Sequence, residues 1–258
     1  MVKGLYTAYT GMINEQHRMD TLTNNLANST TVGFKKEGST SQSFDSLLAY
    51  KIKDISDAPN IPRRVGINNP GVKIGENYTD YSQGSFKITD NTYDLALSGD
   101  GFFTIEFTNK AGETSTMYTR DGSFSVNTEG YLVTKDGDYV VGSKGHIKLD
   151  PTKEASIDSA GRISQEDVVV DTIKFTDFAD YDYLEKYGEN LLRPVEGATF
   201  RDANVKVYSG YLEMSNVNIV TEMVDMIAIT RQYEANQKII KSIDETLEIA
   251  STQIGRIG

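Results

Sequence analysis

Heptad repeats at both ends constrain this 258-residue chain more than any other feature. Near the start, apolar residues recur every seven positions at Leu5, Met12, Met19 and Leu26, and Ala8 and Leu22 occupy intervening positions. Near the end, the same spacing recurs: Ile219, Met226, Tyr233, Ile240, Leu247 and Ile254, with Ile229, Ile243 and Ala250. Because only two positions in seven are apolar, each stripe is narrower than that of a helix lying on a globular core. The repeats predict terminal helices that pair as a coiled coil and pack against neighbouring subunits.

The two helices are expected over residues 3–28 and 215–255, with 219–254 as a 36-residue span of the second. No Gly or Pro occurs from Ser215 to Gln253, and a 36-residue helix would be about 54 Å long. That length exceeds what a domain of this size usually buries. Pairing of the terminal helices is therefore favoured over the alternative, in which the C-terminal helix packs on the rest of its own subunit.

Polar residues interrupt the C-terminal stripe at Glu222 and Asn236. A polar residue in such a seam often fixes the register of the pairing at some loss of stability. Simple tolerance of a polar side chain near solvent is the alternative, and the sequence leaves both open.

The middle of the chain has the two-residue period of β-strands. Short runs rich in Phe, Tyr, Val and Ile alternate with Asp-Gly and Glu-Gly turns; the expected strands are 85–89, 93–97, 102–107, 131–134, 139–141, 168–175 and 205–208. No helical pattern lies between them, which favours an antiparallel β domain over a βαβ fold. The predicted fold class is α+β, with two paired terminal helices and a central antiparallel β domain.

Between the first helix and the β domain, residues 35–83 are polar and contain the Pro, Gly and Asn-rich segment 59–75. Phe44, Leu47 and Leu48 suggest a short helical turn there, and the remainder is expected to be irregular. The predicted organisation is a terminal helical domain from residues 1–34 and 213–258, a connecting segment 35–83 and a central β domain 84–212.

Charge and composition exclude several functions. The formal net charge is -11 and no Lys/Arg cluster occurs, so nucleic acid is not expected as a partner. The sequence has no run of 18 apolar residues and no pattern of a cleavable signal peptide. With no cysteine and only two histidines, His17 and His146, we expect no metal site and no cofactor.

An enzymatic alternative rests on the acidic cluster formed by Asp177, Asp180, Asp182 and Glu185. Paired carboxylates could hydrolyse a cell-wall polysaccharide, although general acid catalysis would require one of them to be buried. Carboxylates this close in sequence more often form a solvated surface. We therefore expect no catalytic residue and no small-molecule substrate, and retain a wall-active enzyme or a soluble coiled-coil binding module as alternatives.

Three separated motifs resemble the bacterial flagellar axial proteins, the family of rod, hook and hook-associated proteins. The first motif is Leu5-Tyr-Thr-Ala-Tyr-Thr-Gly-Met12 followed by Asn24-Asn-Leu-Ala-Asn-Ser-Thr-Thr-Val-Gly-Phe-Lys35. The second comprises Asp94-Leu-Ala-Leu-Ser-Gly-Asp-Gly-Phe-Phe103 and Tyr118-Thr-Arg-Asp-Gly-Ser-Phe-Ser125. The third is Gly210-Tyr-Leu-Glu-Met-Ser-Asn-Val-Asn218 with the following Glu222 to Asn236. They occur in the order that the family has and cover most of the chain.

The resemblance implies a structural subunit of the flagellar basal-body rod, located outside the cytoplasmic membrane. It implies assembly with itself and with other rod and hook proteins, and export by the flagellar type III apparatus. In the family, the terminal helices pack as an inner tube and the β domain forms the outer layer. We therefore expect subunit packing to involve the following residues: Leu5, Met12, Met19, Leu22, Asn24, Asn25, Leu26, Asn28, Ile219, Met226, Ile229, Tyr233, Asn236, Ile240, Ile243, Leu247 and Ile254.

The length of the chain resembles a rod protein more than a hook protein. In the family, distal rod subunits typically carry an extra hairpin after the first signature, and residues 35–83 look too short and irregular to form one. The sequence therefore favours a proximal rod subunit, with a distal rod or hook-type subunit as the alternative.

Overall fold

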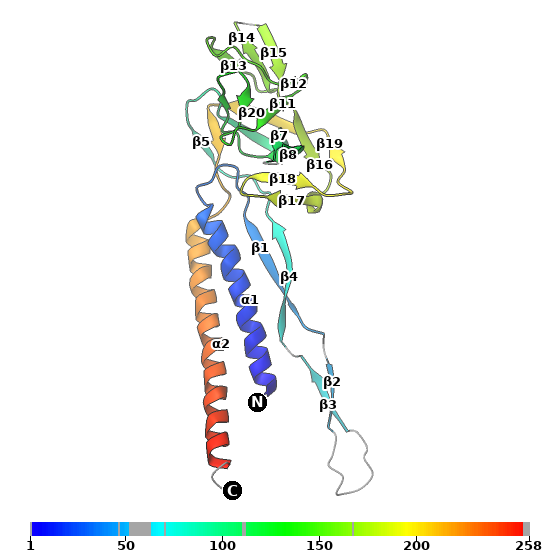
Figure 1. Ribbon diagram of the computed structural model, residues 1–258, viewed down its shortest axis with the longest axis vertical. Coiled ribbons are helices and arrows are strands. Elements are labelled where there is room, and N and C mark those ends of the chain that lie inside the picture. The colour runs from blue at the N-terminus through cyan, green and yellow to red at the C-terminus, as the bar shows by residue number, and fades with distance from the viewer. Residues whose placement is uncertain are drawn as a thin grey trace. The chain divides into compact units, whose positions relative to one another are not determined.

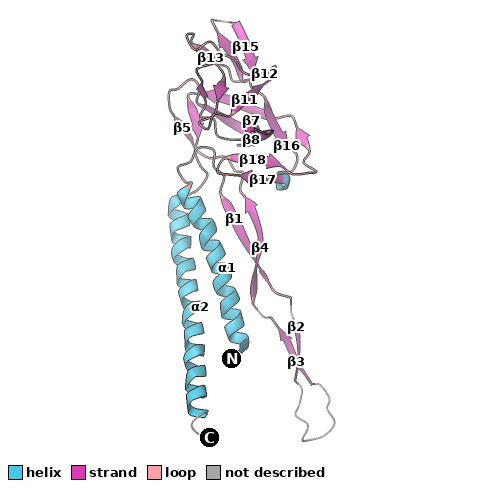
Figure 2. Cartoon of the chain, viewed as in Figure 1, coloured by secondary structure: helices cyan, strands magenta, loops and turns pink. Residues whose placement is uncertain are grey.

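A computed structural model describes residues 2–45, 47–51, 63–69, 71–109, 112–166 and 168–254 (Figures 1 and 2). The chain divides into two compact units. We call the first the helical unit; it comprises residues 1–26, 37–78 and 219–258. We call the second the β unit; it comprises residues 27–36 and 79–218. Helices and antiparallel strands together confirm the α+β class.

Two helices dominate the helical unit. They are α1, Val2–Ala27, and α2, Ile219–Ile254. α1 agrees with its expected bounds to within one residue, whereas α2 begins four residues after the expected start at Ser215 and ends one residue before the expected end at Gly255. Glu222 lies in the first turn of α2, where a carboxylate interacts favourably with the helix dipole. Figure 1 shows the two helices running alongside each other, with the start of α1 beside the later part of α2.

Strands complete the helical unit, where the sequence suggested an irregular segment and a helical turn. They are β1 (Glu37–Ser43), β2 (Leu47–Lys51), β3 (Arg63–Asn68) and β4 (Val72–Thr79). β1 pairs with β4, and β2 pairs antiparallel with β3. The expected helical turn at Leu47 and Leu48 is wrong, because those residues begin β2. Residues 52–62, including Pro59 and Pro62, lie outside the described part of the chain.

Polar contacts join β1 to α1. Asn14 Nδ2 donates to Ser41 Oγ at 2.9 Å, and Asn25 bonds to the backbone of Glu37. A segment with few apolar residues can thus be ordered by side-chain hydrogen bonds to a helix. The composition gave no sign of strands because these contacts are not hydrophobic.

The β unit is built around one large sheet. Its strands follow the order β17-β18-β8-β7-β11-β10-β9, with β12 on β11, β16 on β7 and β19 on β16. Their bounds are β7 (Phe102–Thr108), β8 (Thr114–Thr119), β9 (Ser125–Val126), β10 (Leu132–Val133), β11 (Tyr139–Gly142), β12 (Gly145–His146), β16 (Phe175–Phe178), β17 (Leu184–Tyr187), β18 (Leu191–Pro194) and β19 (Phe200–Arg201). A short 3₁₀ helix, η1 (Tyr181–Tyr183), precedes β17.

Three smaller sheets complete this unit. They are β13-β14-β15, β20-β6 and β21-β5. Their strands are β5 (Phe86–Ile88), β6 (Leu95–Asp100), β13 (Ala155–Ile157), β14 (Arg162–Gln165), β15 (Val168–Thr172), β20 (Asn204–Ser209) and β21 (Tyr211–Glu213). In each of these three sheets the paired strands run antiparallel, as the closely spaced glycine turns suggested.

The core of the β unit lies between these sheets. Buried aliphatic and aromatic side chains from β6, β7, β11 and β14 meet there, among them Leu97, Phe103, Ile105, Val140 and Ile163. Full burial of one such side chain contributes about 1.5–3 kcal/mol, so this cluster is the main source of stability in the unit. Within the described part of the chain, no helix is long and apolar enough to span a membrane.

Candidate functional site

A buried carboxylate at the end of β21 organises the chain segments that lead to and from the two helices. Glu213 is fully buried. Lys35 Nζ donates to its Oε1 at 2.7 Å, and Arg120 NH1 donates to its Oε2 at 3.2 Å. The backbone N–H of Gly84 donates to Oε1 at 3.0 Å. One carboxylate therefore holds two buried cations and a backbone amide, and we call this set of groups the Glu213 network.

Burial affects the charges in this network. Lys35 and Arg120 are both only 5% exposed at their side chains. Burial lowers the pKa of Lys35 below its usual range, and the neighbouring Glu213 carboxylate opposes that shift. Lys35 Nζ also donates to Ser82 O at 2.8 Å, and Arg120 NH2 donates to Gly99 O at 2.6 Å. Each cation thus has a carbonyl partner as well as the carboxylate.

The turn after α1 fits tightly into the same region. Gly33 has a φ of 71°, in the left-handed region that favours glycine. A Cβ atom there would lie 2.6 Å from the backbone carbon of Arg120 and closer still to the backbone nitrogen of Asp121. The Gly33 N–H donates to Glu213 O at 2.8 Å. Glycine is needed here both for its backbone conformation and for its lack of a side chain.

Further hydrogen bonds hold the residues on either side of the network. Lys36 N donates to Asn216 Oδ1 at 2.8 Å, and Asn216 Nδ2 donates to Asp80 O at 2.8 Å. Lys186 Nζ donates to Lys35 O at 2.6 Å and lies 4.3 Å from the ring centroid of Phe34. Residues 33–36 and 213–216 are therefore fixed next to each other within the β unit.

The Glu213 network brings together all three sequence motifs. Gly33 and Lys35 come from the first motif, Gly99 and Arg120 from the second, and Glu213 from the third. Sequence reasoning did not identify the network as a site. The available signal was a charged residue within the strand Tyr211-Leu-Glu213, between the buried Leu212 and the start of α2.

Within the helical unit, Asn25 has a comparable joining role. Its side chain is fully buried. Nδ2 donates to Glu37 O at 2.8 Å and Oδ1 accepts from Glu37 N at 2.9 Å. The side-chain amide thus makes the pair of hydrogen bonds that the backbone of a neighbouring strand would make at the start of β1. Nδ2 also lies 3.3 Å from Glu222 Oε2 on α2. Asn25 thus connects α1, β1 and α2 within one chain.

Contacts between α1 and α2 follow a single antiparallel register. A Cβ atom at Gly4 would lie 3.8 Å from Ile243 Cδ1, and one at Gly11 would lie 3.0 Å from Asn236 Nδ2. Gln232 Nε2 lies 3.2 Å from both carboxylate oxygens of Glu15, in the amide orientation that gives each group a partner. Together with Asn25 and Glu222, the residue numbers of all four contacts add to 247. The helices therefore remain in register along their shared length.

The face of α1 that contacts α2 differs from the stripe seen in the sequence. It carries Gly4, Gly11, Glu15 and Asn25. Ala8, which belongs to the predicted stripe, is 5% exposed. Leu5, Met12, Met19 and Leu26 lie one residue further on, about 100° around the helix, and are half-buried, as is Leu22. The lack of a side chain at Gly4 and Gly11 leaves room for the side chains of Ile243 and Asn236 on α2, which the apolar stripe did not reveal.

The expected stripe on α2 is its less exposed face. Met226, Tyr233, Asn236, Ile240 and Ile243 are half-buried, and Ile229 is 2% exposed. Ile219 is 39% exposed and Leu247 is 42% exposed, whereas the side chain of Ile254 lies outside the described part of the structure.

The asparagines that follow the N-terminal stripe have different environments. Asn24 is exposed, with Nδ2 lying 3.5 Å from Glu37 Oε2. Asn28 is 9% exposed and accepts from Thr31 Oγ1 at 3.1 Å.

The acidic cluster forms structural contacts. Asp177 is buried, contrary to the expected solvated surface, and accepts from Arg201, from Tyr181 OH at 2.8 Å and from the Phe178 N–H at 2.8 Å. Burial and the adjacent Asp177 raise the pKa of Tyr181. Asp180 Oδ1 accepts from Asp182 N at 3.0 Å and so caps η1. No group of three or more potential metal ligands occurs among the described residues.

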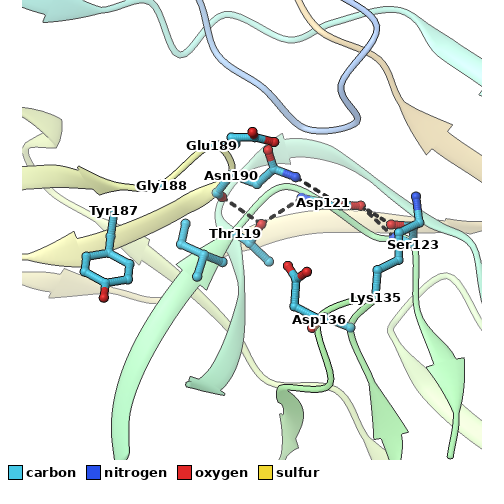
Figure 3. Close-up of a pocket in the computed structure, with 11 residues that line it drawn as sticks. Thr119, Asp121, Ser123, Lys135, Asp136, Tyr187, Gly188, Glu189 and Asn190 are labelled. Carbon is cyan, nitrogen blue, oxygen red and sulfur yellow. Dashed lines mark hydrogen bonds between the residues drawn. The ribbon is translucent and has the colours of Figure 1, made fainter. Parts of the chain in front are cut away.

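A polar cavity of about 320 Å³ lies beside the turn between β17 and β18 (Figure 3). Its lining includes Asp121, Ser123, Asp136 and Asn190. Asp121 Oδ1 accepts from Ser123, and its Oδ2 accepts from Asn190 Nδ2 at 3.0 Å. These bonds hold two turns of the β unit together, so the Asp121 carboxylate already has internal partners.

Comparisons with known proteins agree with the arrangement of motifs. Residues 5–35 match the family described as "Flagella basal body rod protein", and residues 208–253 match "Flagellar basal body rod FlgEFG protein C-terminal". Residues 96–165 match "Flagellar hook protein FlgE/F/G D1 domain". The matched ranges include Gly33, Lys35, Arg120 and Glu213.

Similar full-length proteins come from several bacteria. The chain is 35% identical to the flagellar basal-body rod protein FlgG of Bacillus subtilis, covering 96% of this chain and 97% of the relative. It is 32% identical to FlgG of Borreliella burgdorferi, covering 97% and 98% respectively. It is 31% identical to the flagellar basal-body rod protein FlgF of Caulobacter vibrioides, covering 100% and 99%. This chain therefore belongs to the flagellar basal-body rod protein family.

Proposed function

We propose that this chain is a self-assembling structural subunit of the flagellar basal-body rod, in which the two terminal helices form the assembly surface. Its partners would be further copies and other rod and hook proteins. The observation that carries this proposal is the single antiparallel register of α1 and α2, in which α2 extends past the described part of α1 and carries the exposed Leu247 there. Under this proposal, the pair acts as a short coiled coil that neighbouring subunits extend.

The register places α1, Val2–Ala27, alongside residues 220–245 of α2. α2 continues to Ile254, so nine further residues (254 minus 245), about 14 Å of helix, extend past the start of α1. Leu247 occupies a seam position in this extension and is 42% exposed. A neighbouring helix that covered it would bury an apolar surface that one chain leaves exposed.

Changing Leu247 to Asp tests this assembly role. We expect loss of rod assembly and of motility, because the change would place a charge in a buried contact between subunits. Unfolding of the isolated chain should shift by no more than about 0.5 kcal/mol, because Leu247 is exposed there. Motility assays and denaturation curves measure the two effects.

Thr246→Asp is the matched control, since Thr246 is exposed, adjacent and off the seam. It should leave assembly intact. Equal loss of assembly with both variants would show that added charge alone is responsible, and would contradict a specific role for Leu247.

We assign assembly to the helices of the predicted terminal segments 1–34 and 213–258, and a β domain to the predicted range 84–212. In the structure, residues 27–34 and 213–218 belong to the β unit and not to the helical unit. An enzymatic role has no support from the acidic cluster, because Asp177 and Asp180 take part in internal hydrogen bonds. A structural, non-enzymatic role is therefore preferred to a wall-active enzyme.

The strands in residues 37–79 bear on the position within the rod. The preference for a proximal subunit rested on the apparent lack of an extra hairpin, and the antiparallel pair β2 and β3 removes that basis. Since the family resemblance associates such a hairpin with distal rod subunits, we propose the distal position for this chain.

Export by the flagellar type III apparatus is also part of the proposal, with the N-terminal segment as the signal. A chain that lacks residues 2–30 should remain in the cytoplasm when it is expressed in flagellated cells. Leu247→Asp, which retains that segment, should still be secreted. Secretion of the truncated chain at the normal level, measured by immunoblotting of the medium, would contradict this role of the N-terminal segment.

A further inference from the structure

The outer faces of the two helices carry a second pair of apolar stripes, separate from the seam between them. On α1, Tyr6 is 61% exposed, Tyr9 is 50% exposed and Ile13 is 39% exposed. Tyr6 and Ile13 each lie two residues after a glycine that contacts α2, which is about 200° around the helix. This stripe therefore lies on the side of α1 opposite α2.

A corresponding stripe lies at the start of α2. Val220 is 71% exposed, Val224 is 60% exposed and Ile227 is 55% exposed. Val220 and Val224 lie two residues on either side of Glu222, and Ile227 lies two residues before the buried Ile229. By the same geometry, this stripe lies on the side of α2 opposite α1.

We propose that the Val220–Ile227 stripe of one copy of this chain docks antiparallel on the Tyr6–Ile13 stripe of the next copy. This inference rests on the proposed function and specifies which surfaces meet. The spacing of the stripes matches in one register: Ile227 lies opposite Tyr6, Val224 opposite Tyr9 and Val220 opposite Ile13. The residue numbers of each pair add to 233.

Neighbouring registers fit less well. One heptad further along α2, Arg231 and Glu234 would lie opposite Tyr9 and Tyr6. One heptad in the other direction, Tyr9 and Ile13 would lie opposite positions that precede the start of α2 at Ile219. Of these three registers, only the one in which residue numbers add to 233 pairs three exposed apolar residues with three exposed apolar residues. This match favours a second copy as the occupant.

The register also defines how copies would be related. Within one chain, the residue numbers of facing pairs add to 247, whereas between copies they would add to 233. The difference of 14 residues, or two heptads, corresponds to about 21 Å along the helix axis. Each copy would present both stripes, on opposite faces of its helix pair. Because the two docking surfaces are different, the contact is heterologous and does not close into a two-fold dimer. Repetition of the contact generates a continuous helical array.

Site-directed crosslinking can test this register, because the natural chain has no cysteine. The chain carrying both Tyr9→Cys and Val224→Cys would replace the natural copy in flagellated cells, and isolated basal bodies would be treated with a short bismaleimide. We expect a ladder of multimers after denaturing electrophoresis. Tyr6→Cys with Ile227→Cys should give the same ladder, and serves if the first variant does not assemble.

Asp20→Cys with Val224→Cys is the matched control. Asp20 is exposed on the same face as Tyr9 but lies 11 residues away, about 16 Å along the axis. We expect at least tenfold less crosslinking than with Tyr9. Each single variant alone should give no dimer, whereas a mixture of the Tyr9→Cys and Val224→Cys chains should give dimers only.

Three outcomes would overturn the proposal: assembled rods with no crosslink in either pair, equal crosslinking through Asp20, or dimers from Val224→Cys alone. The last would indicate a two-fold contact. These outcomes leave the rod function intact, since the chain would still be in the basal body. Absence of the unmodified chain from basal bodies would instead refute the proposed function itself, so the two failures are distinguishable.

Discussion

Replacing Glu213 with Gln is expected to destabilise the β unit by about 3–5 kcal/mol, because it leaves two buried cations without their counter-charge. Lys35 Nζ and Arg120 NH1 both bond to this carboxylate, and neither side chain is more than 5% exposed. Glutamine has nearly the same size, so the loss would reflect charge and hydrogen bonding more than packing. Chemical denaturation of the full chain, followed by circular dichroism, measures the change.

Glu185→Gln is the control for this prediction. Glu185 pairs with Arg193 at 2.6 Å, but both side chains are more than half exposed. Exposed ion pairs contribute up to about 1 kcal/mol, so this variant should unfold close to the wild type. Similar losses in the two variants would mean that burial of the Glu213 network does not determine its contribution.

The sequence predicted the helices well because their signal is local. Periodic apolar residues and flanking turn residues indicated both helices, and the absence of Gly and Pro supported the second. The structure places α1 within one residue of its expected ends, whereas α2 begins four residues later than expected. The strands that begin at Tyr139 and Phe102 were predicted for a similar reason, since runs of apolar residues between glycine turns are typical of buried strands.

The missed strands have weaker local patterns. β8, Thr114–Thr119, begins with three exposed residues, and β1, Glu37–Ser43, consists of polar residues and glycine. What makes β1 a strand is its pairing with β4 and the bonds from Asn25 to Glu37. Those partners are distant in sequence or belong to side chains, so periodicity within the segment carries no sign of them.

The contact face of α1 shows a different limit. Apolar periodicity selected Leu5 and Met12, whereas Gly4 and Gly11 contact α2. Hydrophobic patterns report which residues avoid water, but close helix packing can instead require small side chains. Glycine lowers the stability of an isolated helix. At positions 4 and 11 its small size becomes favourable only when α2 packs against α1.

The Glu213 network was not predictable as a site, because its members lie in three distant parts of the chain. The family resemblance identified all three motifs but not the bonds between them. In the structure, Lys35, Arg120 and Glu213 meet within hydrogen-bonding distance. The motifs therefore have a shared physical role: they fix the segment after α1 beside the segment before α2.

Replacing Gly33 with Ala is expected to destabilise the β unit by about 2–5 kcal/mol. An Ala residue at a φ of 71° costs about 1–2 kcal/mol in backbone strain. The added Cβ would also meet the backbone of Arg120 and Asp121, and a forced shift of packed groups costs about 1–3 kcal/mol more. That shift would weaken the bond from Gly33 N to Glu213 O and so disturb the Glu213 network.

Gly188→Ala separates these two contributions. Gly188 has a φ of 72°, almost the same as Gly33, but no atom lies within 4 Å of the position its Cβ would occupy. Its replacement should therefore cost only the strain, about 1–2 kcal/mol. Denaturation curves of the two variants under identical conditions give the difference that arises from close approach alone. If both variants lose the same stability, the turn after α1 can move away from Arg120 without cost, and the tight fit at Gly33 does not hold the two segments together.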